Sequence, residues 1–526
     1  MHGLMMERPL LISDLLVHAD TWHGDAQVVS VDSAGNASRS DYRTLHRRAR
    51  QLARALLALD IMPGTRVATL AWNDSRHLEL YFAVPGIGAV CHTINPRLTT
   101  AQIAWIIDHA QDVIVFYDAG FRATADALKP ACPAVRRWIE LGETGASGDD
   151  YEALFADGND DYEWPAFDER GAASLCYTSG TTGEPKGVLY SHRSTLLHAG
   201  AICLPDSFCI GARDVILPVV PMFHVNAWGL PYVAAMTGAS LVLPGPRLDG
   251  PSLVGLMERE AVTIAAGVPT VWQRVLGHLQ GGVPCPQALE RIVIGGSAAP
   301  PAMVDAFEND LGVRVLHAWG MTESSPLGVV NMPRRAPDAA APEVRRAQQL
   351  KQGRPPFGIE LRIVDPVGRD LPHDGAAQGE LLLRGHWVAS GYYHNEATQL
   401  RDGWFPTGDI ASIDSDGFMA ITDRVKDVIK SGGEWISSIE LENAAAGCPG
   451  VTEAAVIGVP DAQWGERPLL VVVPAAGTAL QGDDVLSWLR ERVPRWWLPE
   501  RVEFAEQLPH TATGKVSKLE LRKRYR

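Results

Sequence analysis

Hydrophobic residues in the first part of the chain alternate between helical and strand spacing. In residues 40–59, four of them recur every three or four positions: Leu45, Ala49, Leu52 and Leu56. This spacing places them on one face of a helix, and Ser40 in front of them is the expected N-cap. The short apolar runs 66–72 and 112–117 predict strands. Helices that alternate with short strands predict parallel α/β layers.

The C-terminal part has a different pattern. Residues 451–459, 467–473 and 501–504 have the composition of strands, and residues 483–493 have the spacing of a helix. These elements are enough for a small α+β domain with a core of its own. We place its boundary near Lys426.

Two segments have the composition of exposed linkers. Residues 142–165 contain eight acidic residues and no Lys or Arg. Residues 332–352 are rich in Ala, Arg and Pro and include a helical stretch. Because charged and Pro-rich stretches are rarely buried, both segments are expected on the surface.

Composition narrows the class of protein. With 526 residues the chain is too long for one hydrophobic core, and its net charge of −15 argues against sequence-independent binding of nucleic acid. Its seven cysteines form no CxxC pair and no zinc-type spacing, which is typical of reduced thiols in a cytoplasmic enzyme. The N-terminus lacks a signal-peptide profile, and no run of about 18 apolar residues predicts a membrane span.

The loop at 177–187 has the sequence Tyr-Thr-Ser-Gly-Thr-Thr-Gly-Glu-Pro-Lys-Gly. Its glycines allow a close approach to a ligand, and its hydroxyls and Lys186 can donate to phosphate oxygens. An apolar run at 172–176 precedes it and predicts a strand. The loop therefore indicates a polyphosphate cradle, although it is not a Walker loop. A surface hairpin is the alternative.

Four further motifs follow in order: Ala-Trp-Gly-Met-Thr-Glu at 318–323, Gly-Trp-Phe-Pro-Thr-Gly-Asp at 403–409, a long motif at 423–436, and Thr-Gly-Lys at 513–515. With the loop, they resemble the adenylate-forming superfamily of acyl-CoA synthetases, firefly-type luciferases and peptide-synthetase adenylation domains over nearly the whole chain. The resemblance implies a large α/β domain with layered mixed sheets (1–425), a small mobile α+β domain (426–526), and the use of ATP, Mg²⁺ and coenzyme A.

The resemblance also implies which residues bind the nucleotide. The phosphate loop supplies Thr178, Ser179, Gly180, Thr181, Thr182, Gly183 and Lys186, and the adenine and ribose side supplies Gly296, Ser297, His317, Ala318, Trp319, Thr322, Asp409 and Arg424. Glu323, with Thr178, is implied to hold Mg²⁺, which prefers one or two carboxylates plus phosphate oxygens. Asp409 is suited to the ribose hydroxyls because its oxygens only accept hydrogen bonds. Trp319 replaces the usual Tyr and can also stack on adenine.

Individually these residues have simpler interpretations. A Thr-Glu pair such as Thr322-Glu323 is often a helix cap, and an Asp after Gly, such as Asp409, is often a turn residue. The combination of motifs favours the functional interpretation.

The C-terminal motifs are implied to serve the second half of a reaction as well as the first. Lys426 occupies the hinge position of the family, and Lys426 and Lys430 can reach the nucleotide. The loop with Gly432, Gly433 and Trp435 is implied to line the pantetheine tunnel, where a side chain would obstruct the channel.

Lys515 matches the adenylation lysine, a catalytic cation beside the carboxylate and α-phosphate. A basic strand-turn remains an alternative for Lys430. Lys518 is expected at the surface.

The segment Pro-Met-Phe-His-Val-Asn-Ala-Trp at 221–228, with 431–437, resembles bacterial medium- and long-chain fatty acyl-CoA synthetases and methylmercaptopropionate-CoA ligases. His224 matches a catalytic position where the acyl and pantetheine channels meet, and Val225 and Trp228 are implied to contact the acid. Trp228 either closes the acyl tunnel until ATP binds or is a core residue.

The sequence thus predicts a cytoplasmic ligase that joins an aliphatic acid to coenzyme A through acyl-AMP, releasing pyrophosphate and AMP. A homodimer is expected by analogy with related enzymes. Alternatives are an acyl-AMP ligase that loads a carrier protein, a CoA ligase for a short thioether or aryl acid, an oxidising luciferase, and a nucleotide-binding protein with a decayed site.

Overall fold

The computed structural model describes residues 1, 3–142, 150–178, 185–332, 342–395, 397–432, 434–475, 477–510 and 516–525. A six-stranded sheet with the order β6-β5-β3-β4-β7-β8 forms the first layer. Its strands are β3 (Arg66–Leu70), β4 (Val90–Thr93), β5 (Asp112–Asp118), β6 (Arg137–Leu141), β7 (Ala172–Tyr177) and β8 (Gly187–Ser191). All neighbours are parallel except β7 and β8. The predicted strands at 66–72, 112–117 and 172–176 are confirmed.

An eight-stranded sheet with the order β14-β13-β12-β11-β9-β10-β1-β2 forms the second layer. It contains β1 (Gln27–Val31), β2 (Ala37–Asp41), β9 (Val215–Pro218), β10 (Ser240–Leu243), β11 (Ile264–Gly267), β12 (Arg291–Ile294), β13 (Arg314–Gly320) and β14 (Leu327–Val330). Only the edge pairs β1–β2 and β13–β14 are antiparallel. The layered mixed sheets expected for the large domain are therefore confirmed.

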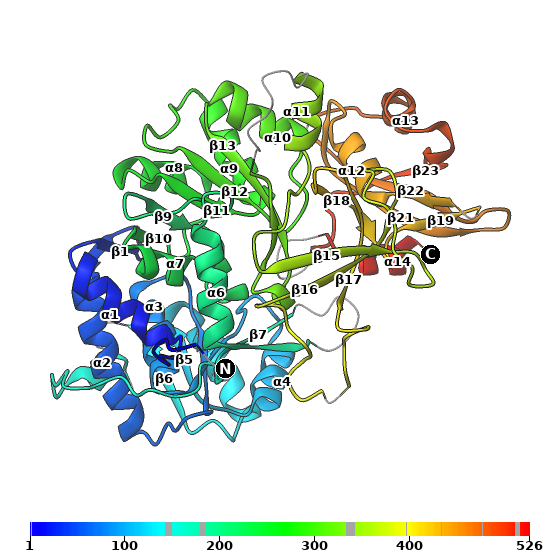
Figure 1. The fold of residues 1–526 in the computed structure, drawn as a ribbon. Coiled ribbons are helices and arrows are strands. Elements are labelled where there is room, and N and C mark those ends of the chain that lie inside the picture. The colour runs from blue at the N-terminus through cyan, green and yellow to red at the C-terminus, as the bar shows by residue number, and fades with distance from the viewer. Residues whose placement is uncertain are drawn as a thin grey trace.

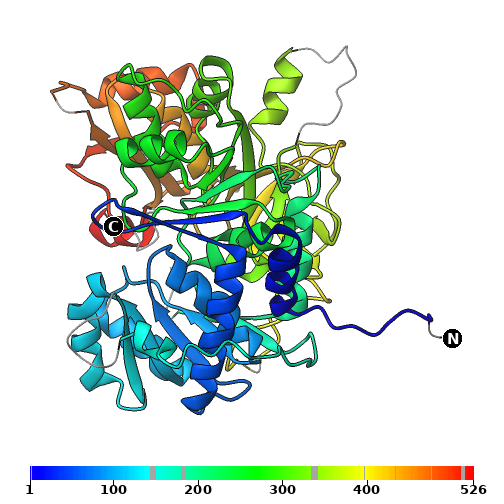
Figure 2. The ribbon, with the colours of Figure 1, turned by 90° about the vertical axis from the view of Figure 1, so that its left-hand side faces the viewer.

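Helices between the two sheets form the main core. They are α1 (Ile12–His23), α2 (Tyr42–Ala58), α3 (Ser75–Gly86), α6 (His192–Cys203) and α7 (Leu230–Thr237), which pack on one another. Figures 1 and 2 show this group between the two layers. Their buried side chains join those of both sheets in one cluster. The remaining helices of this part are α4 (Thr100–Ala110), α5 (Arg122–Leu128), α8 (Gly250–Arg259), α9 (Pro269–Gln280), α10 (Pro301–Asp305) and α11 (Pro342–Gln349).

The chain then forms two smaller sheets, at the right in Figure 1. The first has the order β15-β16-β17-β18, with β15 (Ile359–Val364), β16 (Gly379–Gly385), β17 (Phe405–Ile413) and β18 (Met419–Arg424). The second contains β19 (Ile429–Ser431), β20 (Glu434–Ile436), β21 (Val451–Asp461), β22 (Gly465–Pro474) and β23 (Arg501–Phe504), covered by α12 (Ser438–Ala446), α13 (Gly482–Arg490) and α14 (Lys518–Tyr525).

This last sheet and its helices have buried clusters of their own. The C-terminal strands and helix predicted from the sequence are thus confirmed, together with the α+β character of this part. The boundary and hinge at Lys426 stay predictions. In the described ranges, no helix is long and apolar enough to cross a membrane.

The predicted N-cap of the second helix is wrong by one residue. Ser40 lies in β2, and α2 begins after Asp41, whose side chain accepts from the Thr44 amide at 2.8 Å. The four predicted core residues of this helix are buried. Asp is as good a cap as Ser, and the antiparallel pairing of β2 with β1 places Asp41 at the end of the strand.

The acidic segment is not simply an exposed linker. Tyr151 is fully buried, and Glu152 forms ion pairs with Arg48 and Arg76 at 3.2 and 2.9 Å. The Trp164 indole donates to His46 at 2.9 Å. Basic residues on α2 and α3 therefore hold residues 150–165 against the large domain. Composition alone does not reveal these contacts. Residues 143–149 lie outside the described residues.

The cap assignment can be tested by hydrogen exchange. Asp41→Ala removes the acceptor for the Thr44 amide, and we expect it to destabilise the start of α2 by about 1 kcal/mol. Exchange of the Thr44 amide should accelerate accordingly. Ser40→Ala is the matched control and should leave this rate nearly unchanged. The opposite ranking would restore Ser40 as the cap.

Candidate functional site

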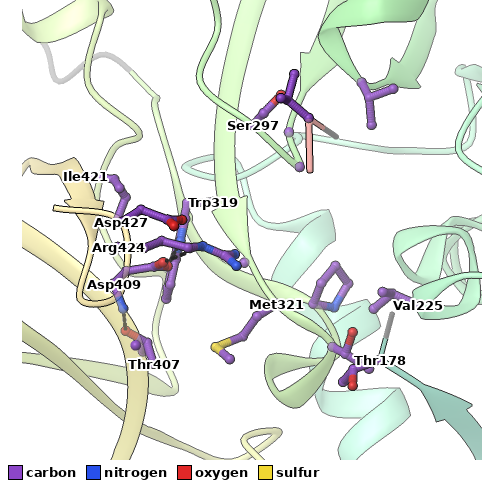
Figure 3. A pocket seen from close by; sticks show the side chains of 18 of the residues that line it. Thr178, Val225, Ser297, Trp319, Met321, Thr407, Asp409, Ile421, Arg424 and Asp427 are labelled. Atoms are coloured by element: carbon purple, nitrogen blue, oxygen red, sulfur yellow. Dashed lines mark hydrogen bonds and ion pairs between the residues drawn. The ribbon is translucent and has the colours of Figure 1, made fainter. Parts of the chain in front are cut away.

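One large cleft lies between the sheets of the N-terminal part and the C-terminal unit, with a volume of about 1980 Å³. Many of the site residues predicted from sequence line it: Thr178, Lys186, His224, Val225, Trp228, Gly296, Ser297, His317, Ala318, Trp319, Thr322, Glu323, Asp409, Arg424 and Lys426. Figure 3 shows Trp319, Asp409 and Arg424 gathered at one side of this pocket, with Thr178 and Val225 at the other. Segments far apart in the sequence thus meet in one cleft.

Other predicted residues are not brought to the cleft. Lys430, Gly432 and Trp435 belong to the β19–β20 hairpin and are not among its lining residues. The Gly432 amide donates instead to the Trp464 carbonyl at 2.8 Å. The predicted residues Ser179, Gly180, Thr181, Thr182, Gly183, Gly433 and Lys515 lie outside the described residues.

Asp409 is held between a cation and an indole. The β17–β18 ladder places Asp409 opposite Arg424, and the Arg424 Nε lies 3.2 Å from Asp409 Oδ1. Trp319 Nε1 donates to the other oxygen, Oδ2, at 2.9 Å. Asp409 is 6% exposed, so these contacts compensate for much of its burial. The hydrogen bond from Trp319 was not predicted from sequence.

Glu323 is a second buried carboxylate, 6% exposed, in the short turn after β13. Tyr392 Oη donates to its Oε1 at 2.5 Å. Burial raises the pKa of Glu323, while the hydrogen bond from Tyr392 and the charges of Lys186 and Arg424 lower it. The Lys186 Nζ also lies 4.7 Å from the centre of the Tyr392 ring, in cation–π contact.

Tyr392 is a site residue that sequence reasoning missed. In the sequence it lies in the Gly-Tyr-Tyr string at 391–393, a pattern that by itself indicates no particular chemistry. In the described ranges no three His, Cys, Asp or Glu side chains gather as a metal cluster. One carboxylate with nearby hydroxyls nevertheless suits Mg²⁺, which keeps several waters and takes phosphate oxygens as further ligands.

His317 is buried and neutral. Its Nε2 accepts a hydrogen bond from the Ala299 amide at 3.3 Å, and burial lowers its pKa to about 4. It therefore fixes the loop after β12, which contains Gly296 and Ser297, through a hydrogen bond and without a charge.

Trp228 lies in a left-handed turn, Val225–Gly229, after His224. The φ angles of Val225, Asn226 and Trp228 are 43°, 48° and 56°, a conformation that costs energy for residues with a Cβ. Asn226 Nδ2 donates to Ser174 Oγ at 2.9 Å and helps to hold the turn.

The Trp228 ring packs against Gly295, where an added Cβ would lie 2.9 Å from it. Trp228 is thus both buried and part of the cleft wall, so the structure is compatible with a core role and with a gating role.

Arg97 is a further cleft residue that sequence reasoning missed. Its guanidinium lies 5.6 Å from the ring centres of both Trp72 and Phe223. Desolvation at the cleft wall and the like charge of Arg274 lower its pKa. Among the described carboxylates, none forms an ion pair with Arg97, so this rim of the cleft presents a cation to an anionic ligand.

The fold and the site together define a class: a two-part α/β enzyme whose cleft collects carboxylates, hydroxyls and cations suited to a nucleotide. The chain belongs to the AMP-binding enzyme family, whose model matches residues 17–393, and the model of the AMP-binding enzyme C-terminal domain matches residues 440–515.

Curated relatives match the chain over its whole length. It is 49% identical to a 3-methylmercaptopropionyl-CoA ligase of Ruegeria lacuscaerulensis, with 100% of this chain and 99% of the relative covered. It is also 49% identical to a medium-chain-fatty-acid–CoA ligase of Ectopseudomonas oleovorans, with 100% and 98% covered. The fold is similar to the crystal structure of an anthranilate CoA ligase in complex with anthranoyl-AMP, with a TM-score of 0.87, 24% identity and 98% of each chain covered.

Proposed function

We propose that the protein is an ATP-dependent acyl-CoA synthetase that activates an aliphatic carboxylic acid as acyl-AMP and then transfers the acyl group to coenzyme A. The observation that carries the proposal is the cleft itself. It joins two clusters of polar residues, each around a buried carboxylate (Glu323 or Asp409), to an apolar wall that includes Trp228. The names of the two curated relatives support the reaction.

In the proposed complex the nucleotide spans the two carboxylates. Asp409, oriented by Arg424 and Trp319, would accept hydrogen bonds from the ribose hydroxyls. Lys186 would neutralise phosphate charge at the other end of the cleft. Glu323 and Thr178 would hold Mg²⁺, and the ion would supply positive charge next to the phosphates when bound.

The acid would bind beyond the phosphates, along the part of the cleft near α6. Ile202, Phe208 and Leu327 line it with apolar surface. His198, in the same wall, is buried and neutral, because burial lowers its pKa to about 3 and its Nε2 accepts from the Leu327 amide. A wall without a charge favours an aliphatic chain over a polar acid.

The first step breaks the bond between the α- and β-phosphates. The carboxylate oxygen attacks the α-phosphorus, pyrophosphate leaves, and acyl-AMP forms. In the second step the thiol of coenzyme A releases its proton to solvent and attacks the acyl carbonyl, the bond between the acyl carbon and the phosphate oxygen breaks, and AMP leaves. Lys515 is proposed to stabilise charge in the first step. The residues on either side of the segment 511–515, His510 and Val516, both line the cleft.

The second step needs the small domain in another pose. The hairpin with Gly432 lies away from the cleft here, whereas the start of α14 lies at it. We propose that rotation about Lys426 exchanges the two, so that Gly432 and Gly433 later line the pantetheine path. A cytoplasmic location and a homodimer belong to the same proposal and are tested by fractionation and by light scattering.

The function is tested by pyrophosphate exchange. We expect exchange into ATP that requires Mg²⁺ and an acid but not coenzyme A, measured over a panel from propionate to palmitate with aryl acids and a thioether acid. Lys515→Ala should slow it about 100- to 1000-fold, as loss of one preorganised charge contact does.

Folded protein without exchange on any acid of the panel would refute the proposal. Exchange without thioester formation from coenzyme A would favour an acyl-AMP ligase that loads a carrier protein.

The role of Trp228 is tested with Trp228→Ala. We expect a change in the rank order of acids, or loss of the requirement that ATP bind before the acid, because the ring lines the cleft and packs against Gly295, next to the proposed nucleotide-binding residues Gly296 and Ser297. Binding of ATP alone should change little. The measurement is initial-rate kinetics over the acid panel. Identical kinetics with every acid would leave Trp228 as a core residue.

We propose that Arg97, a cation in the cleft wall, contacts a phosphate of coenzyme A, and Arg97→Ala tests this contact. Loss of a charge-assisted contact to a phosphate should raise the KM for coenzyme A about tenfold. Pyrophosphate exchange, which needs no coenzyme A, should be unaffected. Arg47→Ala, an exposed arginine of α2 that does not line the cleft, is the control. Equal KM values in both variants would remove Arg97 from the binding site.

A further inference from the structure

Lys518 is not a surface residue, contrary to the expectation from sequence. Its side chain is 13% exposed, and its Nζ lies 2.8 Å from Glu442 Oε1. The same Nζ donates to Ser438 Oγ at 2.6 Å. The Ser438 hydroxyl in turn donates to Asp423 Oδ1 at 3.0 Å. We call these four residues, Asp423, Ser438, Glu442 and Lys518, the Lys518 cluster.

The cluster depends on its one ammonium group. The Asp423 carboxylate is buried and the Glu442 carboxylate partly buried, and desolvation raises the pKa of each, while the charge of Lys518 lowers it. A serine hydroxyl has one proton. The Ser438 oxygen accepts from Lys518, and the hydroxyl proton of Ser438 is donated to Asp423. The Ser438 amide also donates to Asp423, at 2.6 Å from Oδ2. Removing the ammonium would leave two carboxylates without their cation.

The cluster connects residues on both sides of the proposed hinge. Asp423 is in β18, before Lys426, whereas Ser438 is on α12 and Lys518 on α14, after it. By contrast, the ion pair of Arg522 with Asp427, 2.8 Å long, joins two residues that both follow Lys426. Rotation about Lys426 would preserve that pair but would separate Ser438 from Asp423.

The cluster also fixes the start of α14 at the cleft. Val516 and Ser517 line the cleft directly before Lys518. The Ser517 amide donates to the Pro509 carbonyl at 2.7 Å, and His510 and Val516 form an antiparallel bridge. The end of the chain that bears the proposed adenylation lysine, Lys515, is therefore tied to β18 through Lys518.

We propose that Lys518 is a positioning residue for the first half-reaction. Through Ser438 and Asp423 it holds the small domain in the pose in which the start of α14 faces the cleft. The inference rests on the proposed function, and it assigns Lys518 no contact with substrate. Its consequence is a selective effect: loss of the cluster weakens acyl-AMP formation and not the later thioester step, which uses the other pose.

The test compares the two half-reactions in Lys518→Met, made in the full chain. We expect the maximal rate of acid-dependent pyrophosphate exchange to fall about tenfold, as for loss of a charge-assisted hydrogen bond, with little change in the KM for ATP or acid. Thioester formation from supplied acyl-AMP should keep its rate or become faster. Lys518→Arg should restore most of the exchange.

A second variant distinguishes loss of the link to Asp423 from misfolding of Lys518→Met. Ser438→Ala keeps the ion pair of Lys518 with Glu442 but removes the hydroxyl link to Asp423, and it should show the same selectivity with a smaller loss. Arg524→Met, on an exposed residue of α14, is the matched control and should be unchanged.

Equal losses in both half-reactions, or unchanged exchange in Lys518→Met and Ser438→Ala, would overturn the inference. If the wild-type chain itself shows no exchange, the proposed function fails instead.

Discussion

The pairing of β17 with β18 is the constraint on which the site depends. It places Asp409 opposite Arg424, and two residues beyond Arg424 the chain reaches Lys426, the proposed hinge. The carboxylate proposed to bind ribose and the point about which the small domain would turn are therefore built on one hairpin. A change in the register of this hairpin would displace Asp409 from Arg424 and alter the path into the small domain.

Buried charges in the cleft are compensated across elements and not within them. Glu323 is held by Tyr392, which comes from a loop after β16, and Asp409 by Trp319 of β13. Breaking such a pair costs free energy of folding, because removal of the partner leaves a desolvated carboxylate with fewer compensating contacts. They also make the cleft sensitive to the relative position of the sheets, so that the packing of the large domain sets the geometry of the polar site.

The fold class and most of the cleft could be predicted from the sequence, because they depend on local patterns. Strand spacing predicted β3 and β5, and the resemblance of contiguous motifs to a known family implied that Glu323 and Asp409 belong to one site. Contacts between distant segments could not be predicted in this way. Tyr392 and Lys518 have ordinary neighbours in the sequence, and only the fold brings Tyr392 to Glu323 and Lys518 to Ser438. The acidic segment was misjudged for the same reason, since its partner Arg48 lies on α2.

Trp319 shows how one substitution within a family motif can alter a site. The usual Tyr at this position is implied to stack on adenine, and an indole offers an equally flat surface. The indole also carries an N–H, and here that group donates to the carboxylate proposed for the ribose. In the proposed complex, Asp409 Oδ2 would be shared between the indole and a ribose hydroxyl, while Oδ1 faces Arg424. In that complex, recognition of base and sugar would be coupled through Trp319, because a movement of the indole towards the adenine would also reorient the carboxylate proposed to accept from the ribose.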